Sequence, residues 1–153
     1  MYRIEKWSVI DLNITFCGHR KLDNKTAITS WLNIVLPSLI EGGASTFYLG
    51  GYGDFDYLAA KSVRHQKKNY VNIKGVLVLP YTLKSVDISI YDRVIYPLQD
   101  KIDPRFAIVK RNQWMVEASD VIISGVAHDW GGAARTLAYA QEKKKIIVQY
   151  PYK

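Results

Sequence analysis

Thr46-Phe47-Tyr48-Leu49-Gly50-Gly51-Tyr52-Gly53-Asp54 joins a short apolar run to three closely spaced glycines and an acidic residue. The apolar run favours a β-strand, and a helical pattern begins directly after the glycines. Two further turns are of the same kind: Gly18-His19-Arg20 follows an apolar run, and Trp130-Gly131-Gly132 opens another helical pattern. Bare backbone N–H groups and helix N-termini attract phosphate, so these turns indicate a nucleotide-binding module.

Apolar runs and helical patterns alternate along the chain. The runs predict β-strands at 14–17, 46–49, 75–79, 121–124 and 146–148. Helical patterns lie between them, over residues 26–41, 55–63, 106–119 and 134–138. Pro37 lies inside the first of these and is expected to kink it. The alternation predicts an α/β fold, a three-layer sandwich with a mostly parallel sheet of about five strands.

Residues 81–104 show no sustained period, although residues 86, 88 and 90 alternate and the apolar residues 94–96 could pair briefly. An irregular segment of this length in a compact domain is usually functional. We therefore interpret it as a candidate lid or binding loop.

Length and composition fit one globular domain over residues 1–153, with 48% apolar and 23% charged residues. The lone cysteine, Cys17, excludes an internal disulfide and a cysteine-built metal site, and it indicates a reducing environment. Residues 1–8 lack the apolar core of a signal peptide, and no apolar run approaches the roughly 18 residues of a membrane helix. We expect a cytoplasmic protein with no membrane partner, no cofactor and no bound metal.

The formal net charge of +7 is compatible with nucleic acid, a membrane surface or a phosphorylated small molecule as partner. Lys67-Lys68 and Lys143-Lys144-Lys145 fall at the ends of helical patterns, where cations suit the helix dipole. No basic run is interleaved with aromatic residues in the manner of a groove that follows a nucleic-acid strand. The charge therefore favours a solvated surface over a nucleic-acid interface.

The glycine turns supply many of the candidate ligand-binding residues. Gly50, Gly51 and Gly53 allow a ligand to approach the backbone and allow positive φ, and Asp54 stands where a helix N-cap belongs. A tight turn with a capping aspartate explains the same pattern equally well. Gly131-Gly132-Ala133 is the stronger signal, because it opens a helix and leaves N–H groups unpaired, and we place a phosphate there.

Charged side chains add to the predicted site. Arg20 follows Gly18 and His19 and offers the bidentate fork that suits phosphate. His19 is more simply interpreted as a half-buried histidine held by backbone groups. Arg111 lies beside Asn112 on the inward side of its helix, where a cation must find a partner. That partner is either a ligand phosphate or a structural carboxylate such as Asp120 or Asp54.

The remaining candidates could contact a sugar or a base. Asp54 or Asp56 could take a ribose hydroxyl, and Tyr52 or Trp130 could stack on a base. His128, like His19, is an acid-base candidate. The chain has no Ser-His-Asp order, no Gly-x-Ser-x-Gly turn and no Walker lysine, so no catalytic residue is assigned.

Four stretches in combination resemble the YpsA-like branch of the SLOG superfamily. They are residues 15–20, residues 47–56 with 58–60, residues 110–116 with 119–120, and residues 131–134 with 139–140. The resemblance implies a Rossmann-like domain that binds a nucleotide-derived ligand at the carboxyl edge of its sheet. It also implies ADP-ribose or its cyclic isomers as signals, in conflict between bacteria and phages.

The related LOG phosphoribohydrolases carry a Pro-Gly-Gly-x-Gly-Thr-x-x-Glu turn, whose glutamate serves glycosidic cleavage together with an arginine. The corresponding turn here runs from His128 to Thr136 and has no glutamate at that place. We therefore expect a non-catalytic binding protein that senses or sequesters an ADP-ribose or cyclic ADP-ribose type of molecule and forms a homo-oligomer, a dimer or higher. The alternatives are an N-glycosidic hydrolase that uses Asp54 or Asp129, and a nucleic-acid-binding protein with distant similarity to the DNA-processing protein A domain.

Overall fold

The structure, a computed structural model, describes residues 10–82, 87–98 and 102–152. The strands are β1 (Leu12–Gly18), β2 (Ala44–Leu49), β3 (Lys74–Val78), β4 (Arg93–Ile95), β5 (Val121–Gly125) and β6 (Ile146–Gln149). The helices are α2 (Lys25–Glu41), α3 (Asp54–Gln66), α4 (Pro104–Glu117) and α5 (Gly132–Glu142). All strand pairs are parallel, in the order β4-β3-β2-β1-β5-β6. The predicted α/β fold with a parallel sheet is confirmed.

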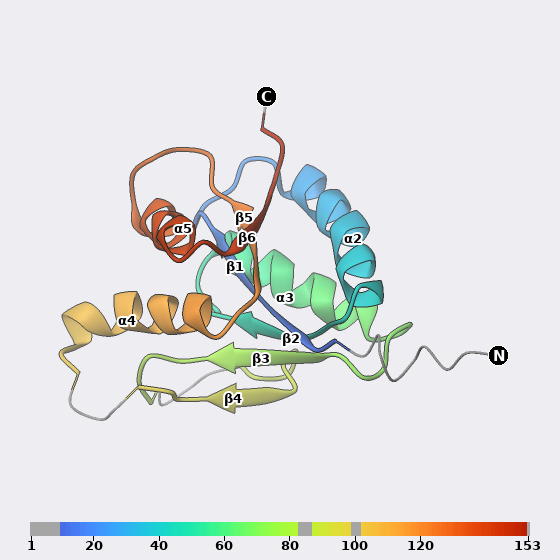
Figure 1. The fold of residues 1–153 in the computed structure, drawn as a ribbon, viewed down its shortest axis with the longest axis horizontal. Helices are drawn as coiled ribbons and strands as arrows, with labels where there is room; N and C mark the ends of the chain where they lie inside the picture. Colours follow the sequence, from blue (N-terminus) through green and yellow to red (C-terminus); the bar gives the residue numbers. More distant parts are fainter. Residues whose placement is uncertain (1–9, 83–86, 99–101, 153) are drawn as a thin grey trace.

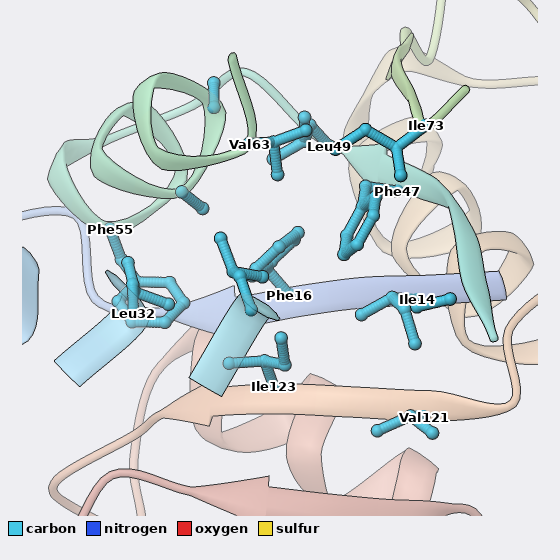
Figure 2. Packing of buried hydrophobic residues seen from close by; sticks show 14 of the residues in the cluster. Ile14, Phe16, Leu32, Phe47, Leu49, Phe55, Val63, Ile73, Val121 and Ile123 are labelled. Carbon is cyan, nitrogen blue, oxygen red and sulfur yellow. The ribbon is translucent and has the colours of Figure 1, made fainter. Parts of the chain in front are cut away.

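Two helices cover each face of the sheet (Figure 1). Residues that alternate along β1 separate the two layers: Ile14 and Phe16 pack with α2 and α3, whereas Cys17 packs with α4 and α5. On the first face, Phe16 lies 6.2 Å from Phe47 and 6.5 Å from Phe55 between ring centroids (Figure 2). This is the predicted three-layer sandwich, and α2 continues through Pro37. No helix in the described part of the chain is long and apolar enough to cross a membrane.

The sheet has six strands rather than about five, and the additional strand lies in the segment interpreted as a lid. β4 pairs with the edge of β3, where Val94 stands opposite Leu77 and the Leu79 N–H donates to the Ile95 carbonyl at 3.0 Å. The Asp92 carboxylate accepts from the Gly75 N–H at 2.7 Å and pairs with Lys67. Three residues are too few for a period to be visible in the sequence. Residues 83–86 and 99–101 of the candidate lid lie outside the described residues, as do residues 1–9.

Gly18 and Gly125 stand opposite each other at the ends of β1 and β5, and together they make room for the ring of Phe55. A Cβ at Gly18 would lie 2.1 Å from Phe55 Cγ, and one at Gly125 would lie 2.3 Å from Phe55 Cε1. Phe55 is fully buried, so its ring cannot move aside. Gly18, which the sequence suggested as a ligand contact, is therefore required by core packing.

Replacing Gly125 with alanine is expected to lower the free energy of unfolding by roughly 1–3 kcal/mol, the usual cost of overpacking a well-filled core. Gly132→Ala is the matched control, because a Cβ there meets nothing within 4 Å. Urea denaturation of both variants measures the difference. Equal stability of the two variants would contradict the role assigned to Gly125.

Candidate functional site

A cleft of about 560 Å³ opens where β1 and β5 end side by side. The chain leaves these neighbouring strands in opposite directions across the sheet, and such a switch point is the usual ligand site of an open parallel sheet. The walls come from the turn after β1, the loop before α5 and the inner side of α4. The lining residues are Phe16, Cys17, Gly18, His19, Arg20, Lys21, Tyr52, Asp56, Ile108, Arg111, Asn112, Met115, His128, Trp130, Gly131, Gly132, Ala133 and Thr136.

Most of the predicted ligand-binding residues lie around this cleft, and four lie outside its lining. Gly50, Gly51, Gly53 and Asp54 belong to the turn after β2, of which Tyr52 alone lines the cleft. The turn needs glycine for its own shape, since φ is +70° at Gly51 and +94° at Gly53. The described residues of the 81–104 segment also do not line it.

The sequence suggested Asp54 as the N-cap of α3, and the structure shows that it is not. Gly53 occupies the cap position, and α3 begins at Asp54. The Asp54 carboxylate instead accepts a hydrogen bond from the Leu22 N–H at 3.0 Å, and Lys25 Nζ lies 3.6 Å from it. Asp54 therefore fastens the loop after β1 to α3 and holds one wall of the cleft.

Arg111 is 3% exposed and spans the end of the sheet. Its Nη1 donates to the carbonyls of Gly50 at 3.0 Å and Val78 at 2.7 Å, and its Nε donates to Asn112 Oδ1 at 2.9 Å. Nη2 has no hydrogen-bond partner among the described residues. The guanidinium is thus held by backbone carbonyls, and Arg111 also belongs to the lining of the cleft.

Neither predicted carboxylate partners Arg111. Asp120 Oδ2 accepts from the Asn13 N–H at 2.8 Å, and Asp54 is held as described above. The acidic neighbour of Arg111 is Asp56, and the two meet at Gly50, where a Cβ would lie 3.0 Å from Asp56 Oδ2 and 3.3 Å from Arg111 Cζ. Gly50 permits this approach because it has no side chain.

Asp56 is half-buried and lines the cleft. Burial raises the pKa of its carboxyl to about 6, although the hydrogen bond from the Tyr52 N–H, at 3.2 Å, and the charge of Arg111 act in the opposite direction. Asp56 can therefore exchange a proton near neutral pH. The sequence placed it among several equivalent acidic candidates, because burial of a helix residue by other segments has no local signal.

Three aromatic rings form a column along one wall. The ring centroids of His19 and His128 lie 3.9 Å apart at 19°, and those of His128 and Trp130 lie 3.7 Å apart at 12°. His19 Nε2 accepts a hydrogen bond from the Ala127 N–H at 2.8 Å, which agrees with the prediction of a histidine held by backbone. Trp130 ends the column and is 69% exposed.

The lining of the cleft also carries positive charge. Arg20 and Lys21 are exposed at the cleft, and the Arg20 guanidinium lies 4.3 Å from the centroid of the Tyr52 ring. α5 begins at Gly132 after Gly131 (φ +92°), and no side chain caps it. Its first N–H groups and the positive end of its dipole are therefore available to an anion.

Six lining residues were not predicted from the sequence: Phe16, Cys17, Lys21, Ile108, Met115 and Thr136. Ile108 and Met115 lie on the same side of α4 as Arg111, at helical spacing, so the inward position of Arg111 was a usable signal for them. Burial raises the pKa of the Cys17 thiol to about 12, so it is not a nucleophile at neutral pH. Among the described residues, no group of three His, Cys, Asp or Glu side chains is arranged to hold a metal.

No protein-family model and no curated protein sequence matches the chain. Among solved structures, the fold is similar to DNA processing protein A from Helicobacter pylori, with a TM-score of 0.67 and 17% identity over 93% of this chain and 66% of that chain. It is also similar to the Moco carrier protein from Chlamydomonas reinhardtii, with a TM-score of 0.56 and 20% identity over 92% of this chain and 76% of that chain. At these identities the similarity shows the fold alone, and it agrees with the predicted Rossmann-like α/β fold.

Proposed function

We propose that this protein binds a nucleotide-derived small molecule of the ADP-ribose type and does not cleave it. One observation carries the proposal: an uncapped helix N-terminus and the buried Arg111 line the same cleft, at the switch point of the sheet. Arg111 Nη2 has no hydrogen-bond partner among the described residues. The molecule would be sensed or sequestered in the cleft. A carrier protein of the same fold, named for its small-molecule cargo, supports this class of function.

Phosphate groups fit the rim of the cleft. The first turn of α5 offers N–H groups, and Arg20 and Lys21 add positive charge. Asp56 lies deeper, beside Arg111, where a carboxylate would repel phosphate and accept a hydrogen bond from a sugar hydroxyl. The cleft therefore suits a ligand with phosphate at one end and a ribose at the other.

Cleavage of an N-glycosidic bond requires a carboxylate beside the reacting sugar. Asp54 and Asp129, the candidates from the sequence, do not line the cleft, and Asp54 is held by Leu22 and Lys25. Asp56 is the acidic residue among the lining residues, so a hydrolase would have to use it. Its place beside Arg111 is equally suited to holding a hydroxyl.

Calorimetric titration with ADP-ribose tests the binding proposal. Arg20→Ala is expected to weaken affinity by roughly 1.5–3 kcal/mol, the scale of a charge-assisted hydrogen bond. The fold should survive, because the Arg20 backbone is held independently by the Asp54 N–H at 2.8 Å. Arg64→Ala, an exposed position of α3 outside the cleft lining, is the control and should bind as the wild type does. Equal affinity of all three proteins would remove Arg20 from the site.

Product analysis tests the absence of cleavage. The protein is incubated in excess with ADP-ribose and denatured by heat, and the supernatant is examined by mass spectrometry. Intact ADP-ribose is the expected result. Products of N-glycosidic cleavage that are absent with Asp56→Asn would establish the hydrolase instead.

A nucleic-acid-binding function is the second candidate, favoured by the net charge of +7. The structure of DNA processing protein A concerns single-stranded DNA binding by that protein. Binding of a strand would weaken steeply with salt, because phosphate contacts release counterions. A shallow salt dependence together with measurable ADP-ribose affinity favours the small molecule. Light scattering after size exclusion tests the expected homo-oligomer.

A further inference from the structure

The aromatic column is built from two loops that are distant in the sequence. His19 comes from the turn after β1, whereas His128 and Trp130 come from the loop between β5 and α5. Each ring lies within 4 Å of the next and close to parallel, at 19° and 12°. One face of Trp130 rests on His128, and with 69% of the residue exposed, the other face is open at the cleft.

We propose that the open face of Trp130 is a stacking platform for a planar heteroaromatic ring of the ligand, and that the two imidazoles hold this platform in place only while His19 is uncharged. The proposal rests on the proposed function, since the ring would belong to a ligand in the same cleft. It decides between Trp130 and Tyr52, which the sequence left as equal candidates.

Tyr52 is less suited to this role, because the Arg20 guanidinium already lies 4.3 Å from the centroid of its ring. Trp130 has the larger ring system, and two further rings behind it fix its orientation. An oriented indole loses little conformational freedom when a base stacks on it, whereas a free side chain must first be ordered. Stacking tolerates any planar base, so the platform selects for a planar ring and not for a particular pattern of hydrogen-bonding groups on the base.

The hydrogen bond from the Ala127 N–H requires a lone pair on His19 Nε2. Protonation of His19 would place a hydrogen at that position, break this bond and set a cation against His128. Ala127 precedes His128 directly, so losing the bond releases the loop that carries the other two rings of the column, His128 and Trp130. His19 is therefore a positioning residue, which acts on the ligand through Trp130.

Several charged or titratable side chains lie around His19: Arg20 and Lys21 on its own loop, Asp54 and Asp56 on α3, Arg111 on α4, and His128 across the stack. Burial, and then the neighbouring His128, lower the pKa of His19 below its ordinary value of 6.5. His19 is consequently neutral at pH 7.5, and it takes up a proton only on acidification below pH 6.5. The platform should be complete at neutral pH and weakened on acidification below pH 6.5.

Calorimetric titrations at pH 7.5 with two probes test the platform. ADP-ribose carries a base, and ribose 5-phosphate does not. Trp130→Ala should weaken ADP-ribose binding roughly 5- to 150-fold and leave ribose 5-phosphate unchanged, while Trp130→Phe should retain most of the affinity for ADP-ribose. If Trp130→Ala binds ADP-ribose as tightly as the wild type, the platform is wrong and the proposed function stands.

A second titration with ADP-ribose between pH 5 and 8 tests the role of His19, since the pyrophosphate does not change its charge in this range. Affinity should fall on acidification in the wild type but not in His19→Gln, whose side-chain carbonyl can accept from the Ala127 N–H without titrating. Asp56→Asn should still show the fall, which separates the effect of His19 from that of Asp56, whose pKa is about 6. An unchanged fall in His19→Gln would overturn the proton dependence.

The platform can also be tested without a ligand. The emission of Trp130, taken as the difference between wild type and Trp130→Phe, should change between pH 8 and 5 and should not change in a His19→Gln background. If neither probe binds the wild type, the proposed function is wrong. If the emission of Trp130 is also constant with pH, the proposal that His19 holds Trp130 in place is wrong as well.

Discussion

Arg111→Ala is expected to lower the free energy of unfolding by about 3–5 kcal/mol, because it leaves buried polar groups without partners. Nη1 satisfies the carbonyls of Gly50 and Val78, which belong to segments 61 and 33 residues away in the sequence. Without the guanidinium both carbonyls lose this donor, a cavity opens, and Asp56 loses its nearby positive charge. The change therefore loosens the end of the sheet as well as the site.

Urea denaturation at pH 7.5 measures this loss. Lys110→Ala is the matched control, since Lys110 is the preceding residue of α4 and is exposed. The control should stay within about 0.5 kcal/mol of the wild type. A stability of Arg111→Ala within 1 kcal/mol of the control would show that the two carbonyls find other donors, and the role of Arg111 would then be confined to the ligand.

Asp56→Asn should have the opposite effect and raise the free energy of unfolding by about 2–3 kcal/mol at pH 7.5. The folded carboxyl has a pKa of about 6 against an ordinary value of 3.8, and each pKa unit corresponds to about 1.4 kcal/mol. Asparagine keeps an oxygen to accept from the Tyr52 N–H and has no charge to bury. The ionised carboxylate thus lowers the free energy of unfolding of the wild type, as expected of a group kept for function.

The stability difference between Asp56→Asn and the wild type should depend on pH. Between pH 4 and 6 the unfolded chain has lost the Asp56 proton while the folded chain still holds it, so wild-type stability falls as the pH rises through this range. The advantage of Asp56→Asn should be absent below pH 4, grow up to pH 6 and stay constant above. Asp129→Asn, at an exposed position, is the control. A constant difference between pH 4 and 7.5 would contradict the raised pKa.

The periodicity of the chain predicted the five longer strands, the four helices and the parallel sheet, because these depend on patterns within about fifteen residues. The glycine turns predicted where the cleft lies, since parallel strands bring their carboxyl ends to one edge. β4 was not counted among the strands, although residues 94–96 were expected to be able to pair briefly, because three residues carry no usable period and their strand conformation comes from pairing with β3. The fold and the edge of the sheet where the cleft lies thus follow from local signals.

What the sequence determined by itself is which segments form strands and helices, and which edge of the sheet carries the glycine turns. The tertiary structure decided which side chains contact one another. It set Asp56 rather than Asp54 or Asp120 beside Arg111, used Gly18 and Gly125 to seat Phe55, and stacked His19 on His128 and Trp130. These contacts join residues far apart in the chain. Their choice depends on strand register and on how the helices pack, and neither is encoded in the spacing of any single segment.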